Sequence, residues 1–417
     1  MKRNLLALFL TLALALSLAA CGGGGGGATT PTPASGAPEN STAPSTAPSQ
    51  EPSGGDAAGI AKEDLKIGFV HIGDESDKGY TYNMVQGTKE MLANLGIDES
   101  QLVVKYNTEE NDACADAINA CLDAGCQLIF TTSYGFQSYA QEAAKAEPDV
   151  QFVQLTGDTA NTAGLSNYHN AFADIYEGRY LAGVVAGMKA KEIGNPKLGY
   201  VGAFPFAEVI SGYTAFYLGA KSVYPEVTMD VIYTNTWNDA DLESRAAQSL
   251  IDRGAGVISQ HSDSTGPATT AEKNGKFQVG YNADMTTAAP GASMISPRIN
   301  WGPYFTQCVQ HMMDGTEIPT DFTAGYKDGA VVLTDLNEAI AAPGTKEALE
   351  SAEAAIVDGS LEVFQGPLKG DAYDSNGNVS DTLELSESEA FQESDVAGGK
   401  NSAPSFCYVI EGITIVQ

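Results

Sequence analysis

The stretch that decides the fold runs from Lys66 to Leu92 and reads KIGFVHIGDESDKGYTYNMVQGTKEML. It opens with an apolar run, Ile67 to Val70, which is long enough for one buried strand. A polar loop from Gly73 to Lys78 follows, and then a helical pattern that places Met84 and Val85 on its apolar side. A strand, a polar loop and a helix in this order predict the first unit of a doubly wound sheet.

The loop after this strand is the first candidate for a ligand site. In doubly wound sheets, ligands bind beyond the carboxyl ends of the strands. Aromatic rings there offer stacking faces, and polar side chains offer hydrogen bonds. The candidates are His71, Asp74, Asp77, Tyr80, Tyr82 and Asn83. The alternative is a solvated loop with a tyrosine that packs on its own helix.

The N-terminus predicts export and an anchor. Residues 1–20 have the layout of a secretory signal peptide, because Lys2 and Arg3 precede a short apolar run from Leu5 to Leu16. The run ends in Leu-Ala-Ala-Cys, which resembles the lipobox of bacterial lipoproteins, in which the cysteine, here Cys21, is lipidated. A lipid anchor would hold the mature protein at the extracytoplasmic face of a membrane without spanning it. An ordinary signal peptide with a chance cysteine is the alternative.

Composition separates a tether from a folded part. Residues 21–62 begin with the cysteine and six glycines and continue with Thr, Pro, Ala and Ser, which predicts a flexible tether. About 350 residues remain, enough for two lobes. The net charge of −31 and the pI near 4.2 argue against binding of nucleic acid or anionic lipid through a basic surface.

Strand and helix patterns alternate along the remaining chain in two series of similar size. The first series continues to a strand at 168–172, and the second begins at Leu198 after a long helix, 175–190, that is rich in Ala and Gly. Such alternation predicts parallel sheets in two similar lobes, with a small-molecule crevice between them. Five cysteines remain besides Cys21; their spacing matches no common zinc pattern, and we interpret them as small buried side chains.

Eight short stretches resemble one family in the same order along the chain. They are DKGYTY (77–82), IYEGRYLAG (175–183), AFPFAEVI (203–210), WND (237–239), ISQHSD (258–263), GYNAD (280–284), NWGPY (300–304) and VFQGP (363–367). The family is the basic membrane protein family of ABC-transporter substrate-binding lipoproteins. The resemblance implies a type I periplasmic-binding-protein fold, with two doubly wound parallel-sheet lobes joined by three crossing strands. It also implies a purine nucleoside or purine base as ligand.

The same resemblance implies how the chain is divided. The N-terminal lobe would comprise 65–171 plus 285–318, and the C-terminal lobe 172–284 plus 319–417. Relatives end soon after the Gly-Pro dipeptide with a short turn and a closing strand. Here a longer acidic insert occupies 370–400. We expect this insert to be a surface excursion with no role in binding.

Site residues follow from the resemblance position by position. Tyr80 matches the aromatic that stacks on the purine, and Asp284 matches a carboxylate that holds ribose hydroxyls. The alternative role for Asp284 is that of a helix cap before Thr286. His71 stands where relatives that bind nucleosides carry Asp, and a structural hydrogen bond at the strand end is its alternative.

Further positions complete the predicted ligand-binding set. Phe204, Phe206 and Trp237 are candidates for the second stacking face, with core packing as the alternative. Ser133 and Phe136 complete the wall of the first lobe. The remaining members of the set are Asp77, Tyr82, Asn282 and Trp301.

The function predicted from these patterns is capture of a purine nucleoside or base for an ABC importer, by a monomer that works with permease and ATPase subunits and needs no cofactor. No Gly-x-Ser-x-Gly elbow, Walker loop, His-Glu-x-x-His or dinucleotide fingerprint is present. The run His261-Ser262-Asp263 invites a hydrolase interpretation, but neighbouring side chains on a strand point to opposite faces. We therefore expect no enzyme. The alternative function is a ligand-sensing surface lipoprotein that binds a sugar or another small heterocycle, without transport.

Overall fold

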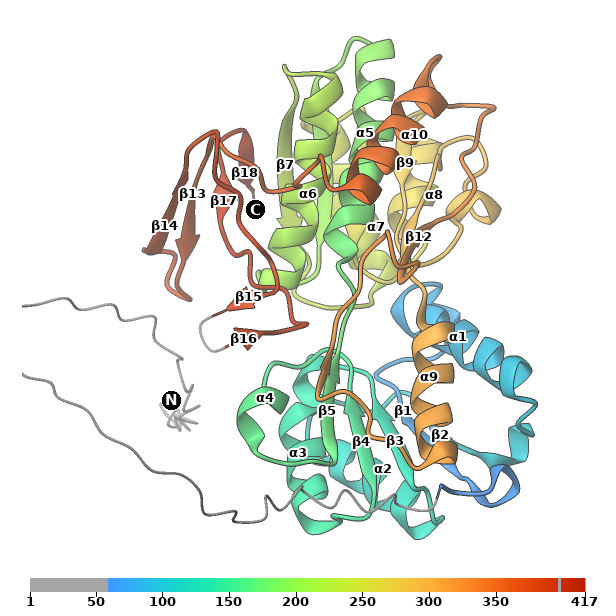
Figure 1. The fold of residues 1–417 in the computed structure, drawn as a ribbon. Coiled ribbons are helices and arrows are strands. Elements are labelled where there is room, and N and C mark those ends of the chain that lie inside the picture. Colours follow the sequence, from blue (N-terminus) through green and yellow to red (C-terminus); the bar gives the residue numbers. More distant parts are fainter. Residues whose placement is uncertain (1–58, 397–398, 417) are drawn as a thin grey trace, which may run out of the picture. The chain divides into compact units, whose positions relative to one another are not determined.

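The computed structural model describes residues 59–396 and 399–416, and all of them belong to one compact unit. The predicted signal peptide, the lipidated Cys21 and nearly all of the tether lie outside the described residues. The described part is an α/β structure with two parallel sheets, each covered by helices on both faces (Figure 1).

The first sheet has six strands in the order β11-β5-β4-β3-β1-β2, and all of its pairs are parallel. Its strands are β1 (Ile67–Val70), β2 (Leu102–Lys105), β3 (Leu128–Thr131), β4 (Gln151–Gln154), β5 (Tyr168–Ala171) and β11 (Asp321–Phe322). Its helices are α1 (Tyr80–Leu95), α2 (Asp112–Asp123), α3 (Gln137–Ala146), α4 (Ala160–Ala163) and α9 (Trp301–Asp314). Alternate strand residues face opposite helix layers: Phe69 and Phe130 pack with α1 and α9, whereas Val70 and Ile129 pack with α2 and α3.

The second sheet has five parallel strands in the order β18-β7-β6-β8-β9. Its strands are β6 (Lys197–Gly202), β7 (Thr228–Tyr233), β8 (Val257–His261), β9 (Phe277–Val279) and β18 (Ile413–Ile415). Its helices are α5 (Ile175–Glu192), α6 (Ala207–Val223), α7 (Ala240–Asp252), α8 (Gly266–Lys273) and α10 (Thr345–Asp358). The two alternating series seen in the sequence thus become two separate sheets, as predicted.

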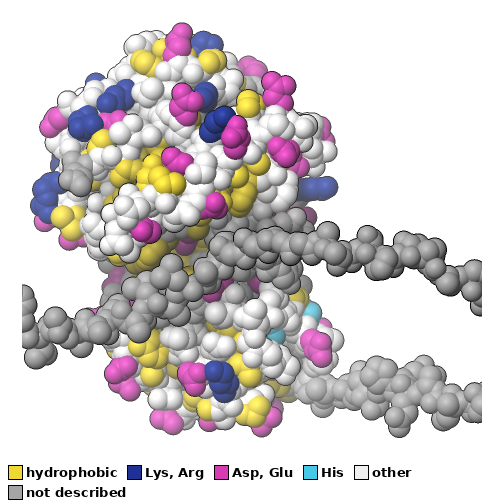
Figure 2. All heavy atoms as spheres, turned by 90° about the vertical axis from the view of Figure 1, so that its left-hand side faces the viewer, with side chains coloured by type: hydrophobic (Ala, Val, Ile, Leu, Met, Phe, Trp, Pro, Cys, Tyr) yellow, Lys and Arg dark blue, Asp and Glu magenta, His cyan; other side chains and the backbone are white. Residues whose placement is uncertain are grey.

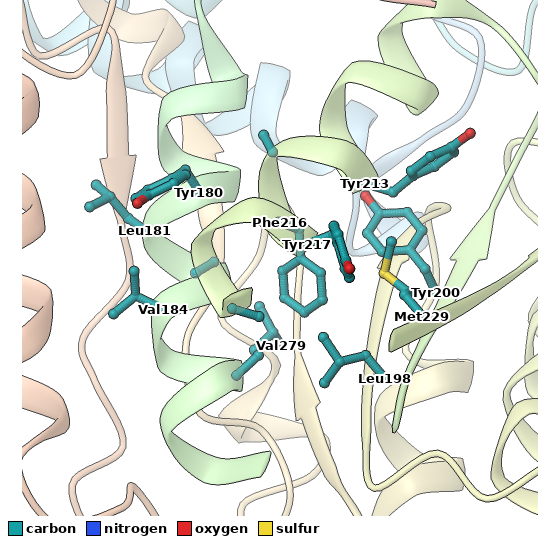
Figure 3. Close-up of a cluster of buried hydrophobic side chains, with 14 of the residues drawn as sticks. Tyr180, Leu181, Val184, Leu198, Tyr200, Tyr213, Phe216, Tyr217, Met229 and Val279 are labelled. Carbon is teal, nitrogen blue, oxygen red and sulfur yellow. The ribbon is translucent and has the colours of Figure 1, made fainter. Parts of the chain in front are cut away.

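The Ala and Gly content of the long helix has a packing cause. A Cβ atom on Gly183 of α5 would lie 2.0 Å from the carbonyl oxygen of Phe216 on α6, and one on Gly219 would lie 1.9 Å from that of Tyr180. Only glycine permits this backbone contact. The close approach lets Tyr180, Phe216 and neighbouring side chains form one dense core with strand residues such as Leu198 (Figure 3).

The chain crosses between the two sheets three times, after β5, before α9 and after β11 (Figure 1). In the crossing region β10 (Pro297–Ile299) pairs antiparallel with β12 (Val331–Leu333). Two predicted boundaries are wrong. Met285 and Met294 pack in the cores of the second lobe, so the return to the first lobe begins later than residue 285. β11 pairs with β5, so the first lobe extends beyond residue 318.

The acidic insert is an ordered part of the second lobe rather than a surface excursion. β13 (Leu368–Tyr373), β14 (Val379–Leu385) and β17 (Val409–Ile410) form a separate antiparallel sheet, and β15 (Asp395–Val396) pairs with β16 (Gly399–Lys400). Leu383, Leu385 and Phe391 of the insert are half-buried and pack against the core that contains α5 and α6. The expectation of a purely external insert is therefore wrong.

Charged side chains are spread over the visible surface of the described part (Figure 2). On the face shown in Figure 2, Asp and Glu side chains are scattered rather than gathered in one patch. No described helix is long and apolar enough to cross a membrane. Cys114, Cys121, Cys126 and Cys308 are buried free thiols, which confirms their interpretation as small core side chains, and Cys407 is half-buried.

The tail is held by a buried acid whose protonation should govern stability. Glu393 is 4% exposed and accepts a hydrogen bond from the Phe406 backbone N–H at 2.7 Å. Burial raises the pKa of Glu393 to about 7. From the usual carboxyl range up to about pH 7 the folded protein therefore binds more protons than the unfolded chain, so the free energy of unfolding falls as pH rises through this window.

Glu393→Gln cannot titrate but keeps an acceptor oxygen. Between about pH 5 and about pH 8, the free energy of unfolding of the parent should fall by about 2–4 kcal/mol more than that of the variant. Denaturant titrations at each pH measure the two changes. Some pH dependence will remain, because burial also raises the pKa of Glu177 to about 7. The exposed Glu387→Gln serves as control. Parallel curves for Glu393→Gln and the parent would contradict this assignment.

Candidate functional site

A cavity with about 400 Å³ of unoccupied space lies between the lobes; we call it the inner cavity. Its lining residues come from the carboxyl ends of strands or from the loops and helix starts that follow them, where doubly wound sheets bind ligands. The first lobe contributes Ile72, Tyr80, Ser133, Tyr134 and Thr156. The second lobe contributes Glu208, Trp237, His261, Asp263 and Tyr281.

Aromatic rings face the inner cavity from both lobes. Tyr80, the first residue of α1, donates a hydrogen bond from its hydroxyl to the carbonyl oxygen of Leu155 at 3.3 Å, which fixes the ring. Trp237 follows β7 and packs edge-on against Phe204, with 5.2 Å between ring centroids. A flat ligand can therefore meet an aromatic surface from each lobe.

The polar part of the second lobe is centred on Glu208, in the first turn of α6. Its carboxylate accepts a hydrogen bond from Nε2 of His261 at 3.2 Å, so the proton of that ring lies on Nε2. Burial, and after it the nearby Arg179, lowers the pKa of His261 to about 4. The imidazole is therefore neutral at physiological pH, and it brings no positive charge to Glu208.

A buried arginine and a tyrosine form the floor behind this pair. The guanidinium of Arg179 lies 3.6 Å from the centroid of the Tyr281 ring and donates from Nη1 to the carbonyl oxygen of Gln260 at 2.7 Å. The Tyr281 hydroxyl is buried and finds no hydrogen-bond partner among the described residues. A polar ligand group at this wall would satisfy it.

Asp263 joins the two lobes. Its Oδ1 atom accepts from the backbone N–H of Tyr80 at 2.8 Å, although the two residues belong to different lobes. Burial, and after it the carboxylate of Asp77, raises the pKa of Asp263 well above its usual range. This contact therefore joins the two lobes directly.

Three of the residues predicted from sequence line the inner cavity: Tyr80, Ser133 and Trp237. Two others stand next to it. Phe204 packs on Trp237, and Phe206 stacks on Phe204 with 5.2 Å between centroids and remains 47% exposed.

Four predicted residues have structural roles at the helix starts and strand ends. His71 is buried, and its Nδ1 lies 3.1 Å from the Thr132 hydroxyl, as its alternative interpretation stated. Asp77 accepts from the backbone N–H groups of Gly79, Thr81 and Tyr82 and so caps α1. Asp284 is exposed and caps a 3-10 turn through Thr286, which again was the alternative. Tyr82 lies under the ammonium group of Lys78.

The last three lie in the protein core or at the crossing region. Phe136 is fully buried beneath the first sheet, because the short turn Tyr134–Phe136 points Tyr134 rather than Phe136 at the cavity. Trp301 stacks on Phe305 in the core. Asn282 has a positive φ of 60° and its side chain faces Asn83. Their assignment to the ligand is not supported by this geometry.

Sequence reasoning missed the polar residues of the second lobe. All four, Glu208, His261, Asp263 and Tyr281, stood inside stretches that matched the family; His261 ends β8, and the others follow strands. The rule that identified the first loop would have identified them too. Ser262 does not donate to His261: the Nδ1 atom of that ring and the Ser262 hydroxyl are both buried, and neither has a hydrogen-bond partner among the described residues. Across the described residues no cluster of His, Cys, Asp and Glu is suited to a metal ion.

Comparisons with known proteins agree with this geometry. The Bmp family, described as ABC transporter substrate-binding protein PnrA-like, matches residues 65–361. A purine-binding protein of Brucella abortus is 36% identical over 313 residues, covering 75% of this chain and 86% of the relative. A putative ABC transporter glucose-binding protein of Haloferax volcanii is 30% identical over 307 residues, covering 73% and 75%.

Solved structures show the same fold at lower identity. A solute-binding protein of an ABC transporter system from Aeropyrum pernix has a TM-score of 0.60 at 15% identity and covers 72% of this chain and 92% of its own. One from Conexibacter woesei has a TM-score of 0.59 at 19% identity and covers 72% and 98%. These neighbours are type I periplasmic solute-binding proteins, so the predicted fold class is confirmed.

The hydrogen bond between the lobes predicts how the closed form depends on Asp263. In Asp263→Ala the Tyr80 N–H would be buried without this acceptor, which costs about 1–3 kcal/mol, whereas water satisfies it when the lobes part. We expect the variant to shift toward a more open form with a larger radius of gyration in small-angle scattering. Asp284→Ala, an exposed cap, is the matched control. Superimposable curves for Asp263→Ala and the parent would show that this bond does not hold the lobes.

Proposed function

Since this chain belongs to the Bmp family of PnrA-like ABC transporter substrate-binding proteins, we propose that it captures a purine base or a purine nucleoside in the inner cavity. One observation carries the proposal: the cavity combines aromatic rings from both lobes with the carboxylates of Glu208 and Asp263. No lysine or arginine is among its lining residues in the described chain.

This combination suits the chemistry of a purine. The heterocycle is flat and stacks on aromatic rings, and its ring N–H and amino groups are donors that a carboxylate accepts. Glu208 presents such an acceptor beside Trp237 and Tyr80. The Brucella relative, which covers three quarters of this chain, is named a purine-binding protein and supports the same ligand class.

A sugar is the competing ligand. The Haloferax relative is named a putative glucose-binding protein, and carboxylates beside an aromatic ring can also bind sugar hydroxyls. In that case the protein would be a surface sensor or an importer for sugars. The stacking surfaces on both lobes favour the flat heterocycle.

Partners follow from the family. ABC substrate-binding proteins act outside the cytoplasm and deliver small molecules to permease and ATPase subunits. We propose that this chain acts as a monomer, held by a lipid on Cys21, and that it carries out no catalytic step. The last point is supported by the family, which consists of substrate-binding proteins.

Calorimetric titration with purines, purine nucleosides and glucose tests the ligand class. We expect the parent to bind at least one purine compound and not glucose. Trp237→Ala should weaken that binding by about 1–3 kcal/mol, because one stacking face is lost. Tyr373→Ala, which removes an exposed ring on β13, should bind like the parent. Binding of glucose alone would replace the proposed ligand class by the competing one.

Membrane attachment is tested by Cys21→Ala. If the cysteine carries the lipid, the variant should appear in the soluble extracytoplasmic fraction, whereas the parent sediments with membranes. Immunoblots of the two fractions measure the ratio. The nearby Thr29→Ala serves as control for altered export. Retention of Cys21→Ala in the membrane fraction would exclude the lipid on this residue as the anchor.

A further inference from the structure

Two of the buried cysteines meet at the end of α2, outside the inner cavity. The helix ends in two hydrogen bonds that together define a Schellman motif. The N–H of Cys126 donates to the carbonyl oxygen of Cys121 at 3.1 Å, and the N–H of Gly125 donates to that of Leu122 at 2.8 Å. Gly125 has a positive φ of 84°, which is the left-handed conformation that this motif requires.

The motif brings the two cysteine side chains together. The residues joined by the outer hydrogen bond of a Schellman motif lie five positions apart, and their side chains frequently touch. Here both residues are cysteines of the same buried core, Cys121 at 0% and Cys126 at 2% exposure. A hydrogen bond between the two thiols raises the pKa of Cys121 and lowers the pKa of Cys126. The two sulfur atoms are therefore neighbours in a site that excludes water.

The surroundings of the pair favour reaction at Cys126. The ammonium group of Lys66 donates to the carbonyl oxygen of Ala124 at 2.8 Å, within the Schellman motif. Lys66 and Lys105 contribute to the lowered pKa of Cys126. A nearby ammonium group favours the thiolate, which is the form that attacks disulfides.

The other described cysteines are not placed to pair with these two. Cys114 precedes Cys121 by seven residues of the same helix, which is about 10 Å along the axis and too far for a disulfide. Cys308 lies in the core on the other face of the first sheet, and Cys407 packs against the core of the second lobe.

We propose that Cys121 and Cys126 are an oxidation site and that they form a disulfide when the chain folds outside the cytoplasm. ABC substrate-binding proteins act there, and disulfides form and persist in such compartments. The inference rests on this location and on the end of α2, and it does not depend on which ligand is captured.

The oxidant is a compound that carries a disulfide. The Cys126 thiolate attacks one of its sulfur atoms, so that a mixed disulfide forms and one thiolate leaves. The Cys121 thiol then loses its proton, and its sulfur attacks that of Cys126 and releases the second thiolate. The two cysteines give up two protons and two electrons, and the oxidant leaves as two thiols. Because the pair is buried in the folded protein, the exchange takes place before α2 packs on the first sheet.

The disulfide would join the end of α2 to the start of β3. Cys126 precedes the first residue of β3, Leu128, by only two positions. The cavity residues Ser133 and Tyr134 follow the opposite end of the same strand. We therefore expect the bond to stabilise the first lobe by restricting the unfolded chain, and to leave the inner cavity unchanged.

Alkylation mapping tests the pair in the exported protein, recovered without reductant, unfolded and treated with N-ethylmaleimide. A protease that cuts before aspartate cleaves at Asp116 and Asp123, and so places Cys114, Cys121 and Cys126 on different peptides. We expect the peptides of Cys121 and Cys126 to be linked and to separate only after reduction. The cysteines outside the pair should carry maleimide from the start: Cys114, Cys308 and Cys407.

Thermal unfolding provides a second readout. Reductant should lower the melting temperature of the parent by several degrees and leave that of the double variant Cys121→Ala/Cys126→Ala unchanged. Cys114→Ala, which removes another buried thiol of the same core, is the matched control and should respond to reductant like the parent. Refolding of the reduced parent with oxidised glutathione should restore the linked peptides.

Maleimide on both Cys121 and Cys126 before reduction would overturn the proposal, and so would a link that includes Cys114. The mapping uses the parent alone, so it decides the question even if the double variant fails to fold. A failure to bind purines would overturn the proposed function without affecting this pair.

Discussion

The structure depends on how the first turn of α1 satisfies its backbone N–H groups. A helix leaves its first N–H groups without internal acceptors. Asp77, in the same lobe, accepts from Thr81 and Tyr82, but the N–H of Tyr80 is taken by Asp263 from the other lobe. The cap is therefore complete only when the lobes meet. One helix start thus sets both the position of the Tyr80 ring and the distance between the walls of the inner cavity.

This arrangement has an electrostatic cost that restricts what else the site contains. Burial raises the pKa of Asp77 and of Asp263, and the nearby carboxylate of Asp77 raises the pKa of Asp263 further. The helix N-terminus, with its partial positive charge, offsets part of that cost. Glu208 and Glu243 lie close enough to raise the pKa of Asp263 further. A ligand that brings N–H or O–H donors relieves this excess of acceptors, whereas an anionic ligand increases it.

The sequence was sufficient for the sheets but not for the site. Local periodicity marks strands and helices, because each segment carries its own pattern. On that basis the strand Ile67–Val70 and a helix over 175–190 were predicted, and the structure has the helix at Ile175–Glu192. Contacts between lobes leave no such local pattern. Asp263 looked like part of a hydrolase run, and its bond to Tyr80 joins residues far apart in sequence. Asp284 illustrates the reverse, because the short turn that it caps through Thr286 could be anticipated from the local sequence.

The tail shows why composition alone misjudged the insert. Its Ser, Gly and Asp content predicts an exposed excursion, yet a few apolar side chains on alternating positions, including Leu383 and Leu385, suffice to hold a three-stranded sheet on the second lobe.

The net charge of −31, like the charge of the site, disfavours anionic ligands. Acidic side chains scattered over the surface give a negative potential that repels phosphate-bearing nucleotides before they reach the crevice, while uncharged purines and nucleosides approach unhindered (Figure 2). Inside, the carboxylate of Glu208 lines the cavity and applies the same preference at contact distance, where solvent screens charge less. Selection against charged ligands is therefore made twice, first by the field of the whole protein and then by the groups that touch the ligand. The first step weakens with salt, but the second is buried and should persist.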